Sequence, residues 1–246
     1  MPATYDTIGR AYAKHRGTDP RLAAAIWTAI GDANTVVNVG AGTGSYEPPD
    51  CRVVGVEPSS IMVAQRPAGS APAVQASAEA LPFRNAAFDA AMAILTMQHW
   101  SDWRRGIKEC ARVARWRVVL FSWDPDSKVF WLVQEYFPEI LALDQRIFPN
   151  LAEISAVLGD FEMRAVPIPA DCADGFLGAF WRRPEAYLDQ AVRTGISSFG
   201  RIADATLGLA RLQRDLASGE WKRRHADLLE RADLDIGYRL IVADRS

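Results

Sequence analysis

Three glycines at alternate positions, set between two short valine-rich runs, restrict this chain to few folds. The runs cover residues 36–39 and 53–56, and β-branched residues flanked by turn residues are typical of buried parallel strands. Gly40, Gly42 and Gly44 let the backbone pass close to a ligand because no Cβ stands in the way. Glu57 follows the second run, where a carboxylate can accept both hydroxyls of a ribose. The segment predicts an α/β sheet that binds a nucleoside-containing cofactor at the carboxyl ends of its strands.

The glycine spacing excludes two common nucleotide sites. The dinucleotide pattern G-x-G-x-x-G requires a glycine where this chain has Ser45, and no Gly-Lys-Ser/Thr of a P-loop follows. No lysine or arginine lies between Thr35 and Cys51 to offer a charge to a phosphate. The sequence therefore argues against a dehydrogenase and against a P-loop nucleotidase.

The pattern Gly40-x-Gly42-x-Gly44 followed by Glu57 resembles motif I and the next segment of class I S-adenosylmethionine (SAM)-dependent methyltransferases. In that family the loop passes the amino-acid part of SAM and the acid binds the ribose. The resemblance implies that one set of residues binds the cofactor: Asn38, Gly40, Ala41, Gly42, Gly44, Glu57 and Pro58. Asn38 departs from the Asp or Glu usual in the family, so it brings no charge to the SAM ammonium.

The resemblance continues along nearly the whole chain. Residues 75–83 (QASAEALPF) are similar to a segment of the type 11, ubiquinone/menaquinone-biosynthesis-like methyltransferases, which implies that Ser77, Ala78 and Glu79 lie beside the adenine. Residues 88–95 are similar to the fourth strand, whose end at Leu95 faces the cofactor, and residues 237–244 to the last strand. The fold implied is an α/β, Rossmann-like, seven-stranded, mostly parallel sheet with its last strand antiparallel, plus helical lid insertions.

Three further regions supply candidates for contact with the substrate or the cofactor. The resemblance places Gln98 and His99 next to cofactor and substrate, and His99 is either a base, a positioning group or a structural part of its loop. In related enzymes an N-terminal segment folds over SAM, which implies that Tyr5 and Arg16 bind the cofactor; both otherwise read as a plain helix face. Asp171 and Asp174 either face the substrate or form turns and caps.

The order of elements predicts six segments. Residues 1–34 form an N-terminal cap and a first helix that begins at Asp19-Pro20, and residues 35–126 form the SAM-binding core. We expect a helical insertion at 127–160, a sixth strand at 161–169, a helical substrate lid at 170–236 and the final strand at 237–246. Trp181 and Tyr187 are predicted to bind substrate from the lid, although aromatic rings also serve as core packing.

Composition limits the partners. A formal net charge of −2 disfavours nucleic acid, and no apolar stretch reaches the ~20 residues that span a bilayer. The three cysteines, Cys51, Cys110 and Cys172, show no metal-ligand spacing, so we expect no metal. Isolated thiols and a polar N-terminus predict a cytoplasmic protein.

These patterns predict an enzyme that moves the methyl group of SAM to N or O of a small, cyclic or aromatic metabolite by in-line displacement, leaving S-adenosylhomocysteine (SAH). Two alternatives stay open. One is an aminopropyl transferase of the same fold, which would need an acidic pocket that neither insertion supplies as a dense cluster. The other is a non-catalytic SAM-binding protein. The acceptor and the oligomeric state are left open.

Overall fold

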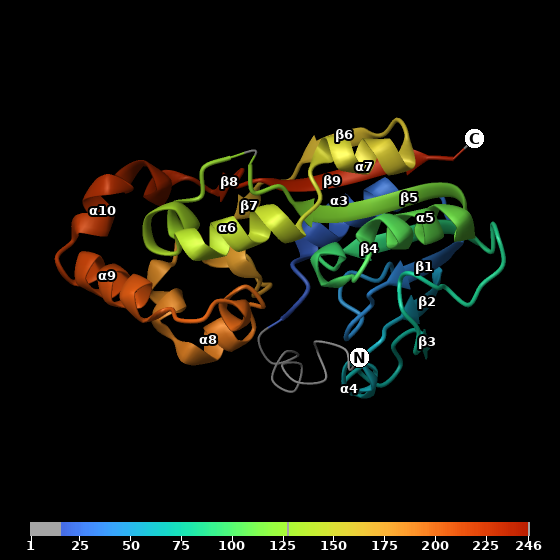
Figure 1. Ribbon diagram of the computed structural model, residues 1–246, viewed down its shortest axis with the longest axis horizontal. Coiled ribbons are helices and arrows are strands. Elements are labelled where there is room, and N and C mark those ends of the chain that lie inside the picture. The colour runs from blue at the N-terminus through green and yellow to red at the C-terminus, as the bar shows by residue number, and fades with distance from the viewer. Residues whose placement is uncertain (1–15, 127, 246) are drawn as a thin grey trace.

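A seven-stranded sheet forms the core of the computed structural model, which describes residues 16–126 and 128–245 (Figure 1). The strands lie in the order β3-β2-β1-β4-β5-β9-β6. β1 to β5 pair in parallel, and β9 is antiparallel to both β5 and β6. The predicted fold is confirmed. The strand bounds are Thr35–Val39 (β1), Arg52–Val56 (β2), Ala73–Val74 (β3), Phe88–Ile94 (β4), Ala114–Trp123 (β5), Glu162–Ala165 (β6) and Tyr238–Asp244 (β9).

Helices cover both faces of this sheet. Alternation along β1 sends Val36 to the core on the side of α3 (Pro20–Ile30) and Val37 to the core on the side of α5 (Trp103–Val113). α7 (Leu151–Leu158) packs beside α5. The start of α3 follows from its sequence, because Asp19 accepts a hydrogen bond from the Arg21 N–H at 2.9 Å and Pro20 occupies the first helical turn.

The position of a ligand site follows from the strand order. β1 has β2 on one side and β4 on the other, so the chain winds in opposite directions from this point. In sheets of this kind, ligands bind in the crevice outside the carboxyl ends of the strands where the order reverses. The short helices α4 (Ser60–Ala64) and η2 (Met97–His99) follow β2 and β4 at this edge.

The sixth strand is shorter than predicted. β6 ends at Ala165, and the Val166 N–H still donates to the Tyr238 carbonyl at 3.0 Å. Pro167 has no N–H and cannot extend the ladder. Ile168–Pro169 (β7) instead pairs with Asp233–Leu234 (β8) in a separate two-stranded sheet.

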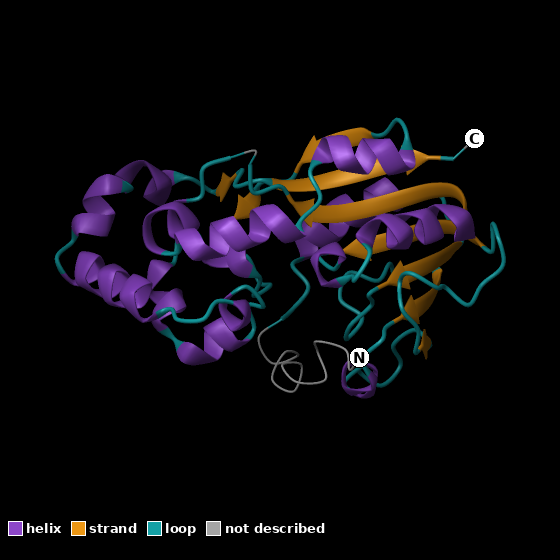
Figure 2. Ribbon diagram, viewed as in Figure 1, coloured by secondary structure: helices purple, strands orange, loops and turns teal. Residues whose placement is uncertain are grey.

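The remaining helices gather at the end of the molecule away from β1 to β3 (Figure 2), in what we call the lid. Its core is continuous with that of the sheet, since Trp131, Leu212 and Trp221 belong to the same buried cluster as Val119 and Phe121. The lid contains η3 (Leu132–Tyr136), α6 (Pro138–Ile147), η4 (Leu177–Phe180), η5 (Pro184–Leu188), α8 (Gln190–Thr194), η6 (Phe199–Arg201), α9 (Thr206–Ala217), α10 (Glu220–Arg224) and η7 (Ala226–Glu230).

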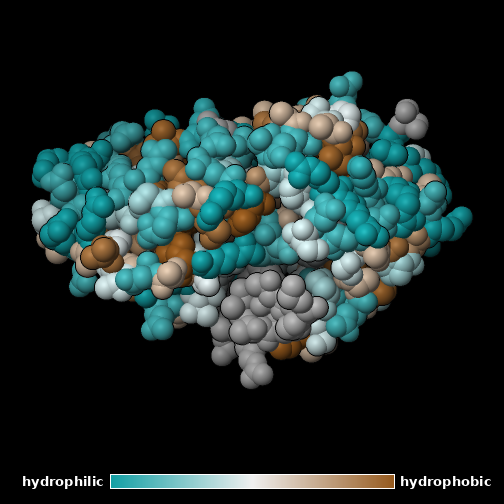
Figure 3. Space-filling model, in the orientation of Figure 1, coloured by the Kyte–Doolittle hydropathy of each residue, from teal (hydrophilic) through white to brown (hydrophobic). Residues whose placement is uncertain are grey.

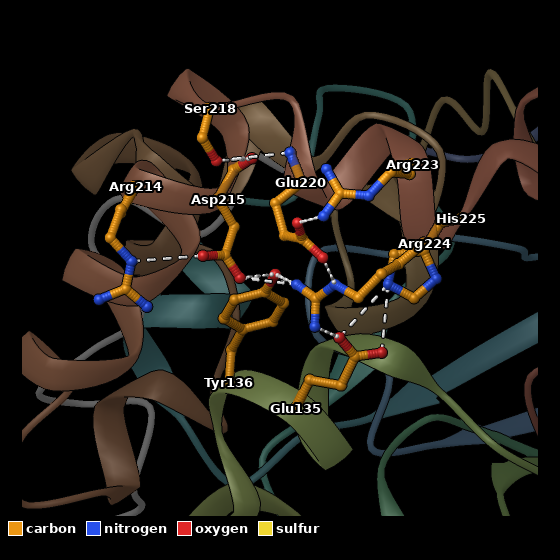
Figure 4. Close-up of polar contacts among 9 residues, drawn as sticks. All are labelled: Glu135, Tyr136, Arg214, Asp215, Ser218, Glu220, Arg223, Arg224 and His225. Atoms are coloured by element: carbon orange, nitrogen blue, oxygen red, sulfur yellow. Dashed lines mark hydrogen bonds and ion pairs between the residues drawn. The ribbon is translucent and has the colours of Figure 1, made fainter.

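A polar cluster fastens the outer lid helices together (Figure 4). The Arg224 guanidinium from α10 donates to the Asp215 carboxylate of α9 and to the Tyr136 hydroxyl of η3, both at 2.6 Å. It also pairs with Glu135 at 2.7 Å, and the Tyr136 hydroxyl donates to Asp215 at 2.9 Å. One arginine therefore joins three helices.

The surface seen in Figure 3 is mainly hydrophilic, with apolar side chains in separate small patches. No helix in the described part of the chain is long and apolar enough to cross a bilayer.

Candidate active site

The glycine loop after β1 makes a sharp bend that only glycine can make at its first position. Gly40 has a φ of 75°, and the N–H groups of Gly40 and Ala41 donate to the Val56 carbonyl at 2.8 and 2.9 Å. A Cβ on Gly40 would lie 2.0 Å from Thr96 Oγ1 at the end of β4. The loop therefore lies directly against the neighbouring strand end, with its backbone facing the crevice.

Glu57 is held at the end of β2 by the loop itself. Its Oε2 accepts a hydrogen bond from the Gly42 N–H and its Oε1 accepts one from the Ser59 N–H, both at 2.9 Å. The side chain is buried, yet it lines a cavity of about 540 Å³. Two backbone donors thus fix the orientation of a carboxylate at the cavity wall.

That cavity brings together most of the predicted cofactor residues. Its volume lies in the usual range for small-molecule sites. The predicted residues that line it are Arg16, Asn38, Gly40, Ala41, Gly42, Glu57, Pro58, Ser77, Ala78, Glu79, Leu95 and His99. Residues that the sequence reasoning missed also line it, among them Tyr46, Met62, Thr96 and Trp100. Thr96 and Trp100 lie close to the predicted Gln98-His99 pair in the sequence, and this position could have identified them as cavity residues.

Two predicted residues, Gly44 in the loop and Asn38 in β1, contact the side chain of Glu47. Gly44 is not among the lining residues; it packs against the Arg66–Glu47 ion pair, whose atoms approach to 2.8 Å. Asn38 does line the cavity, and its Nδ2 donates to Glu47 Oε1 at 3.2 Å. Glu47 thus places a carboxylate next to the amide that replaces the family's acid.

Glu79 faces the cavity but also supports the turn before α5. Its Oε1 accepts hydrogen bonds from the Ser101 N–H at 2.8 Å and the Asp102 N–H at 3.1 Å. Burial raises the pKa of Glu79, but these hydrogen bonds outweigh it and the pKa lies below the ordinary value. Glu79 is therefore an ionised group that links the cavity wall to the turn between η2 and α5.

Arg16 enters the cavity wall from the start of the described chain. Its Nε donates to Asp174 Oδ1 at 2.6 Å, and the Tyr46 hydroxyl donates to Asp174 Oδ2 at 2.8 Å. The sequence predicted a turn, a cap or a substrate contact for Asp174. In the structure Asp174 is buried and its main role is that of an ion-pair partner of Arg16. Tyr5 lies outside the described residues. Asp171 is exposed and pairs with Arg21 at 2.7 Å.

A second, smaller cavity of about 40 Å³ adjoins the first, and Arg16, Leu95 and His99 line both. Leu95 has a φ of 51°, unusual for a non-glycine residue, at the border between the two cavities. The other walls of the small cavity are mainly apolar and include Trp123, Phe148 and Phe176, while Gln98 and Ser198 add polar groups.

His99 is held uncharged at this border. Its Nδ1 is in hydrogen-bond contact with Nη2 of Arg201 from the lid, and because a guanidinium only donates, Nδ1 is the acceptor. Burial, together with the charges of Arg201 and Arg16, lowers the pKa of His99 to about 3. A histidine with so low a pKa is a weak base near neutral pH.

The structure corrects the assignment of Trp181 and Tyr187 to the substrate site. Both side chains are fully buried, and neither lines the two cavities. The Trp181 Nε1–H donates to the Ile168 carbonyl at 2.8 Å, and the Tyr187 hydroxyl donates to the Leu177 carbonyl at 2.6 Å. Their polar atoms are satisfied by backbone, so both rings are core packing of the lid.

The residues around the larger cavity fit a SAM molecule: a loop without Cβ atoms, a fixed carboxylate at the end of β2, and walls from the ends of β1 and β4. Together with the strand order, this arrangement defines a class I SAM-binding fold. Groups of three His, Cys, Asp or Glu that could hold a metal ion do not occur among the described residues.

Comparisons identify the family. A family model described as "Methyltransferase domain" matches residues 37–121. A crystal structure from Anabaena variabilis, described as a "putative methyltransferase from antibiotic biosynthesis pathway", is 30% identical, covers 93% of this chain and 98% of its own, and has a TM-score of 0.85. The chain belongs to the class I SAM-dependent methyltransferases of type 11, and its cofactor is SAM.

Two more distant structures share the fold. A SAM-dependent methyltransferase from Thermotoga maritima, described as "possible histamine N-methyltransferase", is 16% identical, with a TM-score of 0.58 and coverage of 98% of both chains. Phosphoethanolamine N-methyltransferase 2 from Haemonchus contortus, in complex with SAM, is 16% identical, with a TM-score of 0.59, over 98% of this chain and 58% of that one. No curated protein matches the chain.

Proposed function

We propose that this methyltransferase acts on a small, cyclic or aromatic metabolite and methylates it at N or O. The observation that carries the proposal is the small cavity behind Leu95 and His99, because aromatic side chains wall it and it adjoins the SAM cavity. SAM supplies an electrophilic methyl group: the acceptor's lone pair bonds to the methyl carbon as the S–CH₃ bond breaks, its electrons stay on sulfur to give SAH, and the acceptor's proton passes to solvent.

We assign the cofactor roles by position. Glu57 binds the ribose hydroxyls, Ser77, Ala78 and Glu79 lie by the adenine, and the glycine loop passes the amino-acid part. Arg16 lies near the methionine carboxylate, held in place by Asp174. Holding the acceptor in line with the methyl group in a site closed to water can lower the barrier by ~7–11 kcal/mol, so no strong base is required. His99 then positions the acceptor instead of deprotonating it.

The test has two stages. Calorimetry with SAM and SAH measures cofactor binding, and a metabolite extract supplied with methyl-labelled SAM shows whether label is transferred. We expect binding of both and a labelled product of low molecular mass. Binding without transfer to any acceptor would favour a non-catalytic SAM-binding protein. Transfer of an aminopropyl group from decarboxylated SAM to a polyamine would favour the other alternative.

We also propose a cytoplasmic location, supported by three free cysteines.

A further inference from the structure

One carboxyl group of the lid is buried without enough partners. Asp144 of α6 has no exposed surface, and its Oδ2 accepts a hydrogen bond from the Ser198 hydroxyl at 3.3 Å. Its Oδ1 is buried and has no hydrogen-bond partner in the described part of the chain. Buried polar atoms are nearly always satisfied, and leaving one unpaired costs about 1–3 kcal/mol. An orphaned carboxyl oxygen of this kind is explained if a ligand or a water molecule completes it.

Asp144 lies directly behind the wall of the small cavity. Ser198, which donates to its Oδ2, lines that cavity, and so does Phe148, the residue that directly follows α6. Residues four apart lie on one face of a helix, and the Phe148 N–H donates to the Asp144 carbonyl at 2.9 Å. The Asp144 carboxyl group does not itself line the small cavity, and the Ser198 hydroxyl is its hydrogen-bonded link to that cavity.

The charges nearby do not pair with this carboxyl group. Arg16 is bound to Asp174, and the Arg201 guanidinium contacts His99 and the Gln98 carbonyl. No ion pair of Asp144 is present among the described residues. Burial raises the pKa of Asp144 to about 7, although Ser198 and Arg201 act in the opposite direction. At neutral pH the group can accept a hydrogen bond or meet a cation.

The size of the cavity limits what can reach this group. A water molecule requires about 10–15 Å³ of such space, so a cavity of about 40 Å³ holds only a few non-hydrogen atoms. Apolar side chains such as Trp123, Phe176 and Leu177 line it together with the polar groups of Arg16, Gln98 and His99. Only a short part of a ligand, ending in a compact polar group, can therefore enter the small cavity.

We propose that Asp144 positions the acceptor through Ser198: the Ser198 hydroxyl donates to the Asp144 carboxylate, and its oxygen accepts a hydrogen bond from an amine or a hydroxyl at the tip of the acceptor that enters the small cavity. This inference rests on the proposed function, since it assigns the small cavity to the acceptor. Asp144 is a positioning residue, and the border of Leu95 and His99 is where the acceptor meets the cofactor.

The experiment uses the full chain saturated with SAH and three probes with one apolar body: 2-phenylethylamine, 2-phenylethanol and propylbenzene. Calorimetry gives the affinity of each. We expect the amine or the alcohol to bind wild-type protein about tenfold more tightly than propylbenzene, as one hydrogen bond to the Ser198 hydroxyl allows. Asp144→Leu should remove this preference and leave SAH and propylbenzene affinities unchanged. Ser198→Ala should remove it as well, and Asp144→Asn, which keeps an acceptor oxygen for the Ser198 hydroxyl, should retain part of the preference.

Glu139→Gln is the matched control, because it removes a carboxylate from an exposed position of the same helix and should change none of the affinities. Preference for the donor-bearing probes that persists in Asp144→Leu would overturn the inference, and so would equal or absent binding of all three probes to wild type. If SAH itself does not bind, the proposed function fails as well; intact SAH binding with an unchanged preference rejects the role of Asp144 alone. Once an acceptor is known, Asp144→Leu should raise the KM for the acceptor but not that for SAM.

Discussion

At the residue scale, chemistry in this site is set by groups that the backbone or a neighbour holds in one orientation. Glu57 is fixed by two N–H groups and His99 by Arg201. Fixed groups of this kind bind and orient, since neither has to reorganise when a ligand arrives. The same reasoning makes each of them sensitive to a single substitution.

Glu57→Gln should weaken SAM binding by about 1.5–3 kcal/mol, the value of a hydrogen bond to a charged group. The amide keeps the shape of the side chain but loses the charge, and it loses an acceptor oxygen as well. Calorimetry with SAH measures the loss. Asp50→Asn, an exposed neighbour of the loop, removes the same charge from outside the cavity and should change the affinity little. Equal effects of the two variants would contradict the ribose assignment.

Gly40→Ala should destabilise the protein and abolish SAM binding, because the new Cβ meets Thr96 and φ is positive. Gly69→Ala is the control. Its φ is 86°, but no atom lies within 4 Å of the added Cβ, so it carries only the conformational cost of about 1–2 kcal/mol. Urea unfolding of the two variants separates steric clash from backbone strain. Similar losses in both would show that Thr96 moves aside.

At the scale of elements, the lid is held by contacts that run between helices. Arg224 joins α9 and α10 to η3. Within residues 16–126 and 128–245, the guanidinium of the adjacent Arg223 pairs only with Glu220 of its own helix. Both arginines lie on α10 but connect different elements, so Arg223 is a suitable control for a substitution of Arg224.

Arg224→Ala should lower the free energy of unfolding by about 1–3 kcal/mol, because it removes the guanidinium that lies 2.6 Å from both the Asp215 carboxylate and the Tyr136 hydroxyl and leaves Asp215 only the longer contact with Arg214, at 3.5 Å, among its ion pairs in the described part of the chain. Arg223→Ala should change it by no more than about 0.5 kcal/mol. Amide hydrogen exchange should show faster opening of α9 and α10 in the first variant only. Unchanged exchange in Arg224→Ala would show that apolar packing alone holds these helices.

The sequence predicted those parts whose signals are local. Glycine spacing, valine runs and the Asp19-Pro20 cap lie within a few residues of the elements they form, so the sheet, α3 and the cofactor cavity follow from them. Residues of the lid act across long distances: Arg201 meets His99 and Asp144 meets Ser198 without any periodic pattern linking them. The predicted substrate contacts of Trp181 and Tyr187 were wrong for the same reason. Nothing near these residues in the sequence shows whether an aromatic ring faces a cavity or packs in a core.

At the scale of the whole molecule, two buried groups give stability opposite dependences on pH. The pKa of His99 is about 3 in the folded protein, against 6.5 when exposed, so the unfolded chain binds more protons and stability rises with pH up to about 6.5. The pKa of Asp144 is about 7, against 3.8, so the folded chain holds its proton longer and stability falls as pH rises from about 4 to 7. Across most of this range the two contributions oppose each other.

Asp144→Asn should therefore make stability rise more steeply with pH between about 4 and 6.5 than it does in wild type, and His99→Gln should make it fall. Each difference has a limit of about 1.4 kcal/mol per pH unit. The charged and polar groups that act on these two residues are Arg201 and Arg16 for His99, and Arg201 and Ser198 for Asp144. Urea unfolding at a series of pH values measures both slopes. Slopes equal to that of wild type would show that neither shift is present.

Asp174 connects three segments that are far apart in the chain: Arg16 before α3, Tyr46 after the glycine loop, and its own turn before η4. A cofactor that orders the glycine loop therefore also orders the segment that carries Asp174. Part of the entropy cost of ordering the small cavity is then already met before the acceptor binds. Binding of the cofactor in the larger cavity should then raise the affinity of the small cavity for the acceptor. By thermodynamic linkage, the acceptor should raise the affinity for the cofactor by the same factor.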